Sequence, residues 1–295
     1  MVVWHLLWPS GLLSFSFMQN AWMAGSAVAV VSAVVGFFVV LRGASFVAHA
    51  VPRGSFAGAA GAVLMGQSSL LGLGLFALLS SLGIALLGHR RRGAVATALV
   101  LVAALGLGDL FLSIGNVYAP EVFALLFGQV VGISRADVYF VGSLALAVVL
   151  VVVWLYRPLL MHSVSAEVAE VRGLRPVLLD GIFLLLVAAA ATATVPVVGA
   201  LLAFSLMVGP AAAGSLLAKR PSTAVFLSIA LALVSVWISL WLAYITSWPI
   251  GFYVSAWSLV AYLAVRLGQA SRRGRTTLAQ TDGALKTTTR GNFSG

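Results

Sequence analysis

The sequence contains little charge. Of its 295 residues, 17 are Lys or Arg and 7 are Asp or Glu, so charged residues make up only 8% while hydrophobic residues make up 62%. A water-soluble protein of this size could not cover its surface with so few polar groups. The low charge excludes a soluble globular protein and indicates that most of the chain lies in lipid.

Two further absences narrow the class of protein. The chain has no cysteine, which excludes disulfide bonds and thiolate metal ligands. The nucleotide-binding pattern GxxxxGK[ST] is also missing, so any ATP must be bound and hydrolysed by a partner chain. The chain itself is expected to be a transport subunit with no catalytic residue, no enzymatic activity and no covalently bound cofactor.

Long stretches without formal charge predict the fold. Several of them exceed the roughly 20 residues that a membrane-spanning helix needs, and they are continuously apolar rather than alternating, which excludes a transmembrane β-barrel. The predicted fold class is an all-α, polytopic bundle of transmembrane helices. The charge-free stretches are Val2–Leu41, Gly54–His89, Val138–Tyr156, Gly181–Ala218 and Pro221–Val265.

Nine spans are expected within this bundle, with ends uncertain by a few residues. They are 20–42, 44–66, 70–88, 94–114, 138–156, 177–195, 198–218, 223–245 and 250–267. Residues 1–19 are expected to form an N-terminal interfacial segment that is retained, because it lacks the basic start of a cleaved signal and carries Trp4 and Trp8. Residues 20–268 form the transmembrane domain, and the polar residues 269–295 are expected to be a disordered cytoplasmic tail.

The basic residues predict the orientation. If the loop 157–176 is cytoplasmic, nearly all of them fall on the cytoplasmic side and Arg135 is the clear exception, as the positive-inside rule requires. The N-terminus then lies outside, and the protein is a multi-pass protein of the cell membrane. This distribution also accounts for the net charge of +10 without a nucleic-acid partner. The cytoplasmic set is Arg42, Arg90, Arg91, Arg92, Arg157, Arg172, Arg175, Lys219, Arg220 and Arg266.

Two stretches carry local structural signals. In the loop 161–176, Ser165 can cap a short helix that has Glu167 in its first turn and Gly173 at its end; such a helix either docks on a partner or is a simple solvated connector. In the span 198–218, Pro210 follows Gly209 and removes one backbone donor, which predicts a hinge or kink. That hinge either frees carbonyls toward a cavity or is a packing feature.

The sequence resembles the membrane subunits of metal-type ABC importers, the permeases for zinc, manganese or iron. Five segments carry the resemblance, in the right order and at the right spacing, over roughly residues 17 to 265. They are FMQNAWMAG near the start, VVLRGASF, FALLFGQVVGIS at 123–134, AEVAEVRGL, and VVGALLAFSLMVGPAAAGSLLA.

The resemblance implies both function and partners. It implies a permease that moves a divalent transition metal into the cell, a pair of permeases that is most simply a homodimer, two cytoplasmic ATPase subunits and an extracytoplasmic solute-binding protein. It also implies that AEVAEVRGL forms the helix that couples the permease to the ATPase. The coupling residues would then be Ser165, Glu167, Glu170, Arg172 and Gly173.

His49 and Arg53 are the candidate residues of the substrate path, together with Asp109. Family permeases place an Asp and a His one helical turn apart in this region, and the resemblance assigns those two positions to His49 and Arg53. Residues at i and i+4 share a helix face, so His49 is the candidate metal ligand, whereas a guanidinium has only donors and cannot bind a metal. Arg53 lies about 16 Å along the helix from Arg42, near the membrane midplane. It therefore needs a partner or a water-filled cavity, and among acidic partners Asp109 is the first choice and Asp180 the second.

Three interpretations of the pair remain open. In the first, the path passes a metal ion that is held by fewer ligands. In the second, it passes a chelated or anionic metal complex, which the positive charge of Arg53 attracts. In the third, the pair has a structural role only: Arg53 pairs with an acid, His49 packs in a helix interface and Pro52 breaks the helix. For the chain as a whole, a secondary transporter with Asp109 as an ion relay and a membrane scaffold with a degenerate pore are the alternatives.

The remaining polar residues are weaker candidates. The three other histidines are expected to be solvated loop residues rather than metal ligands, and three polar residues of the external connections could receive the binding protein or simply be solvated. The histidines are His5, His89 and His162, and the external residues are Asn116, Glu121 and Asp137.

Overall fold

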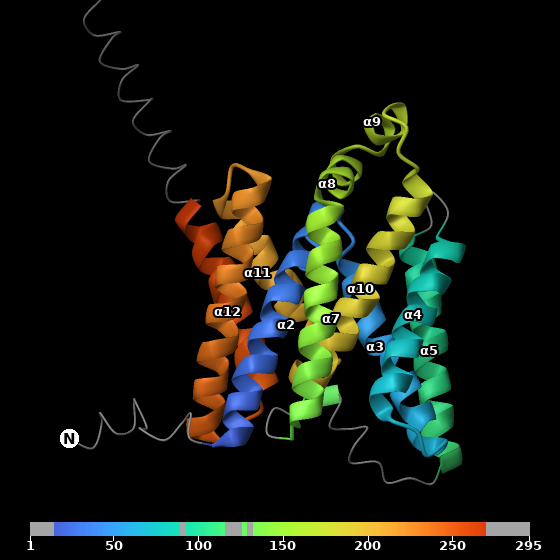
Figure 1. Cartoon of the computed structure of the whole chain (residues 1–295), viewed down its shortest axis with the longest axis vertical. Coiled ribbons are helices and arrows are strands. Elements are labelled where there is room, and N and C mark those ends of the chain that lie inside the picture. The colour runs from blue at the N-terminus through green and yellow to red at the C-terminus, as the bar shows by residue number, and fades with distance from the viewer. Residues whose placement is uncertain (1–14, 89–92, 116–125, 129–131, 270–295) are drawn as a thin grey trace, which may run out of the picture.

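The structure is a computed structural model that describes residues 15–88, 93–115, 126–128 and 132–269. All regular secondary structure in these ranges is helical (Figure 1), which confirms the all-α prediction. The predicted tail from residue 270 onward and residues 1–14 of the predicted N-terminal segment lie outside the described ranges. The candidate residues His5, His89, Asn116 and Glu121 also lie outside them.

Each of the nine predicted spans corresponds to one helix, and two short helices stand between the fifth and the sixth. The labelled helices are α2 Ser16–Leu41, α3 Ser45–Leu64, α4 Ser69–Leu87, α5 Gly93–Gly115, α7 Arg135–Trp154, α8 Tyr156–Val164, α9 Ala166–Val171, α10 Pro176–Val198, α11 Ala203–Leu217 and α12 Pro221–Thr246. A last helix, Ile250–Gln269, closes the described part of the chain. The first described helix begins at Ser16, four residues before the predicted start of the transmembrane domain.

Seven of the described helices are long and apolar enough to cross a membrane. They are α2, α4, α5, α7, α10, α12 and the helix Ile250–Gln269. The other two predicted spans are α11, which has 15 residues, and α3, whose apolar character is interrupted by His49, Pro52 and Arg53. The protein is therefore a multi-pass helical membrane protein with seven candidate spans among its described residues.

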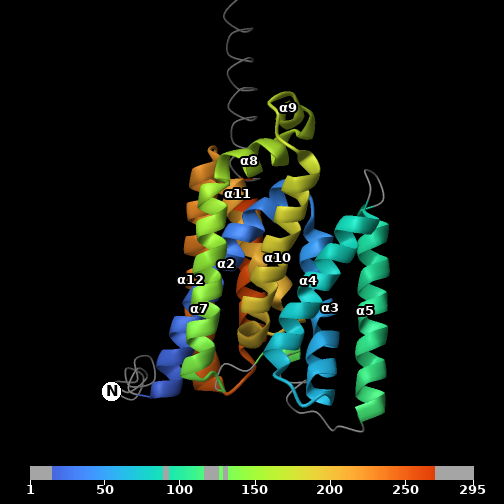
Figure 2. The same cartoon turned by 45° about the vertical axis from the view of Figure 1, so that its right-hand side comes forward.

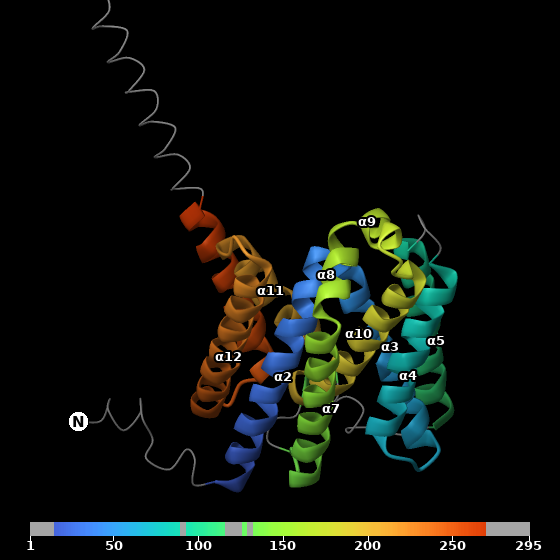
Figure 3. The same ribbon diagram turned by 45° about the horizontal axis from the view of Figure 1, so that its top comes forward.

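The centre of the bundle is formed by α2 and α10, whose residues are mostly buried, whereas α4, α5, α7 and α12 keep most of theirs at the surface. One group of helices, α7, α11 and α12, packs against α2, while α4 and α5 pack against α3. Figure 2 separates the two groups, with α3, α4 and α5 together at one edge of the molecule. Figure 3 shows α11 and α12 side by side at the other edge.

Glycines allow the backbones of α3 and α4 to touch. A Cβ atom on Gly58 would collide with the carbonyl of Gly72, and one on Gly72 would collide with the carbonyl of Gly58. In lipid, helix association depends on such close packing, because burying apolar side chains there gains little. Gly58 of α3 is thus explained by its fit against α4.

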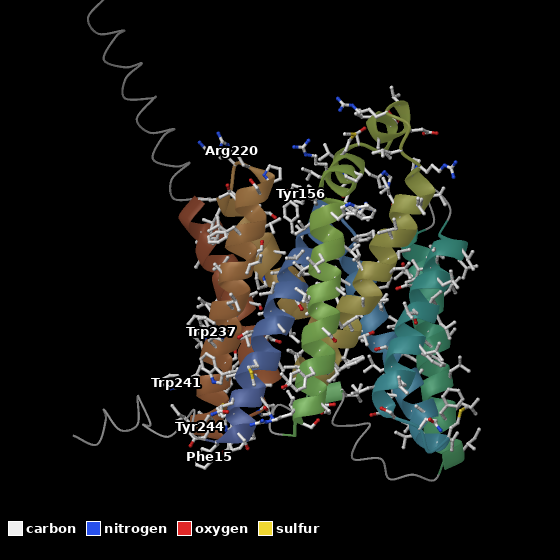
Figure 4. The ribbon with its side chains drawn as sticks, in the orientation of Figure 1. Phe15, Tyr156, Arg220, Trp237, Trp241 and Tyr244 are labelled. Atoms are coloured by element: carbon white, nitrogen blue, oxygen red, sulfur yellow. The ribbon has the colours of Figure 1, made fainter. Side chains whose placement is uncertain are left out.

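The two ends of the bundle differ in their residues. Helices α8 and α9 lie at one end, the same end at which Arg220 and Tyr156 are seen in Figure 4. At the opposite end α12 carries Trp241 and Tyr244 close to Phe15. Trp and Tyr are enriched where a protein meets the membrane interface, so this aromatic end marks one surface of the bilayer.

Candidate translocation path and coupling segment

The side chain of His49 lies on α3 and packs against aromatic rings. Its imidazole stacks on Phe46 with 6.4 Å between ring centroids and meets the edge of Phe204, from α11, at 5.3 Å. The side chain is neither fully buried nor fully exposed, and within the described residues no hydrogen bond engages either ring nitrogen. The nitrogens of His49 are therefore free to bind a ligand.

Arg53 lies one turn further along α3 and has no acidic partner among the described residues. Its Nε atom is buried without a hydrogen-bond partner, and both ion pairs found in the described ranges involve other residues. The predicted pairing with Asp109 is wrong. Gly108 packs against Ala57 of α3, and this turns the neighbouring Asp109 of α5 to the exposed surface.

Pro52 does not break the helix. Helix α3 continues from Ser45 to Leu64 with Pro52 inside it, although proline supplies no N–H to the carbonyl of Ala48. The hydroxyl of Ser55 donates to the Pro52 carbonyl at 2.6 Å. His49 and Arg53 therefore stand on one continuous helix, separated by a proline turn.

The residues described for a single chain do not assemble a metal site of three or more His, Cys, Asp or Glu side chains. His49 is the one predicted ligand of this region, and Arg53 beside it has only donors. A metal ion bound here would need further donors from water, backbone carbonyls or a second chain.

The predicted hinge residues lie inside a continuous helix. Helix α11 runs through Gly209 and the buried Pro210 without interruption. A Cβ atom on Gly209 would lie 2.6 Å from the Cβ atom of Ser258, which belongs to the last helix. Gly209 is thus a point of close packing between two helices, and a hinge role for it and Pro210 stays a prediction.

A junction at the end of α10 was missed by the sequence reasoning. Gly199 and Gly128 have φ angles of +95° and +83°, and their backbones are in direct contact. Leu201 donates its backbone N–H to the carbonyl of Leu126 at 3.2 Å. The segment FALLFGQVVGIS therefore contains a glycine that closes a turn against α10, a role that its spacing alone did not indicate.

The short capped helix predicted in the loop 161–176 is confirmed as α9. Ser165 accepts a hydrogen bond from the N–H of Val168 at 3.3 Å, and Glu167 lies in the first turn. Gly173 ends the helix with φ +78° and donates to the carbonyl of Glu170 at 2.9 Å. A left-handed glycine at this position is the usual helix stop.

Helix α8 was not predicted, and it changes the interpretation of His162. The sequence reasoning placed residues 157–164 in a loop, but they form a helix that buries Leu159 and His162 on one side. His162 is therefore not a solvated loop residue: its Nε2 atom lies 2.8 Å from Oδ1 of Asp180. The i, i+3 spacing of Leu159 and His162 was the signal that could have revealed this face.

Asp180, the second predicted partner of Arg53, pairs with Arg42 instead. Nη1 of Arg42 donates to Oδ1 of Asp180 at 2.8 Å. Burial lowers the pKa of Arg42 below its ordinary value, while the charge of Asp180 acts in the opposite direction. The pair fixes the first turns of α10 to the residue that directly follows α2.

Comparison with known proteins agrees with this architecture. The family model described as the ABC 3 transport family matches residues 14–268. The chain is 28% identical to the manganese transport system membrane protein MntC of Listeria monocytogenes, over 81% of this chain and 86% of that protein. It is 26% identical to the manganese import system permease protein ScaB of Streptococcus parasanguinis, over 86% and 91% of the two chains.

A solved structure shares the fold. The structure of PsaBC from Streptococcus pneumoniae in complex with Fab matches with a TM-score of 0.79 and 22% identity, over 90% of this chain and 95% of that one. The family match over residues 14–268 leads to one assignment, that this chain belongs to the ABC 3 transport family.

Proposed function

We propose that the chain is the membrane-spanning permease subunit of an ABC importer for a divalent transition metal. The observation that carries the proposal is the extent of the family match, which runs from residue 14 to residue 268 and includes α3, α9 and α11 together. Manganese is the first choice of cargo because the relatives MntC and ScaB are named for manganese transport. Zinc and iron are the other divalent cargoes of the same class.

The ATPase is proposed to dock on α9 at the end of the bundle. Val168 and Val171 of α9 are 51% and 89% exposed, and Val164 just before it is 73% exposed. Apolar side chains on a short helix outside the apolar spans favour a protein groove as their partner. Ser165, Glu167, Glu170, Arg172 and Gly173 form or end this helix, which supports their assignment to the coupling segment.

The proposed topology has nine spans, with the N-terminus outside and the C-terminal tail in the cytoplasm. Helix α2 begins at the end of the bundle opposite α8 and α9, while the last helix ends on their side (Figure 1). A chain that enters and leaves on opposite sides crosses the membrane an odd number of times. The arginine Arg220 at the α8 end (Figure 4) supports a cytoplasmic location for that end.

The partners proposed are two ATPase subunits, an extracytoplasmic solute-binding protein and a second permease, most simply a second copy of this chain. Donors from a second copy would also complete a metal site around His49, because the described residues of one chain offer too few ligands there. The metal is cargo in this proposal, so it is bound weakly enough to be released.

Reconstitution tests the proposal. The chain is assembled with its ATPase and binding protein in liposomes, and accumulation of radioactive manganese is followed with and without ATP. We expect uptake that requires ATP and the binding protein. Uptake driven by a proton or sodium gradient without the ATPase would contradict the proposal, and an assembled complex that hydrolyses ATP without moving any metal would favour a scaffold.

A second candidate cargo is a chelated or anionic metal complex. The observation in its favour is Arg53, whose buried Nε has no partner and which shares a helix face with His49. A cation on the path would attract a negatively charged complex and repel a free metal ion. Replacing Arg53 by His separates the candidates: faster manganese uptake supports the free ion, and loss of uptake of an anionic chelate supports the complex.

A further inference from the structure

A cluster of four polar residues joins three helices at the α8 end of the bundle. Arg42 directly follows α2, His162 and Ser163 belong to α8, and Asp180 belongs to α10. The Arg42 and His162 side chains are only 9% and 5% exposed, whereas that of Asp180 is 57% exposed. Within the described residues the two ion pairs both belong to this cluster.

One carboxylate oxygen holds the cluster together. Oδ1 of Asp180 lies 2.8 Å from Nη1 of Arg42 and also 2.8 Å from Nε2 of His162. Because both contacts use the same atom, α2 and α8 are tied to α10 at one point. Moving any of the three helices must break or lengthen at least one of these contacts.

Arg42 connects to α8 a second time. Its Nε donates to Oγ of Ser163 at 2.9 Å, and that hydroxyl donates to the carbonyl of Leu159 at 2.6 Å. The guanidinium also lies 4.4 Å from the centroid of the Phe183 ring on α10, where a cation is attracted by the aromatic face. Only the planar fork of arginine can make these contacts together, since lysine offers one compact charge.

The position of the cluster connects the coupling segment to the core. Helix α8 is followed directly by Ser165 and α9 (Figures 1 and 2). Helices α2 and α10 are the most buried spans of the bundle. A displacement of α9 therefore reaches the core through α8 and the contacts of Arg42, His162 and Asp180.

We propose that Arg42, His162 and Asp180 are positioning residues that transmit the movement of the α8–α9 segment to α2 and α10 during transport. The proposal rests on the proposed function, because it assumes that an ATPase moves α9. It adds a set of residues outside both the α9 helix and the His49 region. The cluster acts through geometry: its contacts hold the three helices in fixed register, so that α8 cannot move alone.

The test compares transport with ATP hydrolysis in the reconstituted importer. Asp180→Asn removes the charge that Arg42 and His162 share, while Asp180→Glu keeps it. We expect Asp180→Asn to lower manganese uptake per ATP hydrolysed about tenfold, which is within the range that typical coupling between sites produces. Asp180→Glu keeps the charge and should retain much of the wild-type uptake per ATP. Arg157→Gln is the matched control, because Arg157 is an exposed arginine on α8 outside the cluster, and its ratio should equal that of the wild type.

A double variant separates positioning from stability. Ion pairs with an exposed partner contribute little to stability, and the Asp180 side chain is 57% exposed, so Arg42→Met with Asp180→Leu should assemble and hydrolyse ATP yet remain uncoupled. Wild-type uptake per ATP in the double variant, or an equal fall of uptake and hydrolysis in Asp180→Asn, would overturn the proposal. Failure of the wild-type complex to transport manganese with ATP would instead contradict the proposed function itself.

Discussion

At the scale of single residues, the proposed substrate path depends on which ligands His49 and Arg53 can bind. The imidazole of His49 has free nitrogens and an aromatic surround from Phe46 and Phe204, which suits a ligand that holds a metal briefly. Arg53 cannot hold a metal, and the described residues offer it no carboxylate. Any metal site here therefore depends on His49.

We predict that His49→Ala removes metal transport while the protein still folds. The ring is only partly buried, so its loss leaves no large cavity, but it deletes a ligand. Uptake of manganese should fall by at least the roughly tenfold that loss of even an outer-shell group costs a metal site. The measurement is ATP-dependent uptake at several manganese concentrations, and unchanged uptake by a well-folded variant would show that His49 only packs.

At the scale of helices, contact between backbones sets the arrangement of α3 and α4. Gly58 and Gly72 face each other so closely that neither tolerates a side chain. Overpacking a core costs typically about 1 to 3 kcal/mol when side chains can move aside. Here the colliding atoms are backbone carbonyls, so the two helices themselves would have to separate.

We predict that Gly58→Leu greatly lowers the yield and melting temperature of folded protein in detergent. Gly106→Leu is the matched control, because a Cβ atom at Gly106 of α5 would meet nothing within 4 Å. Thermal unfolding followed by size-exclusion chromatography measures both variants. A Gly58→Leu protein as stable as the control would mean that α3 and α4 do not pack as described.

Much of this helical arrangement was predictable from the sequence, because long apolar runs specify helices almost directly. The nine predicted segments correspond to nine helices, and α9 was found from its cap Ser165 and its stop Gly173. Helix α8 was missed because it is short and only one side of it is buried. The partner of Asp180 was missed for another reason: a sequence does not reveal which cation of several lies across a helix interface.

At the scale of the whole molecule, the two surfaces of the membrane are distinguished by their residues. The end with α8 and α9 includes Arg220, and the opposite end includes Trp241 and Tyr244 (Figure 4). Arginine near the cytoplasmic surface and aromatic residues at the interface are both typical of membrane proteins. The nine-span topology follows if α3 and α11 also cross the bilayer.

We predict that a thiol at position 65 reacts from outside the cell and one at position 171 only from the cytoplasm. The chain has no cysteine of its own, so Met65→Cys and Val171→Cys each carry one thiol, at sites that are 71% and 89% exposed. Intact cells are treated with a maleimide that cannot cross membranes, and opened cells serve as the reference. Labelling of both thiols in intact cells would contradict the topology.

The central helix α10 is held differently at its two ends. Near its start, Asp180 binds two nitrogen atoms of neighbouring helices, Nη1 of Arg42 and Nε2 of His162. Just past its other end, the turn after Gly199 is tied by one main-chain hydrogen bond, from Leu201 to Leu126. The far end is also deeply packed, with Val197 and Val198 at most 1% exposed, whereas the Asp180 side chain at the start is 57% exposed. Added salt screens exposed charges, so it should loosen the first anchor of α10 and leave the second intact.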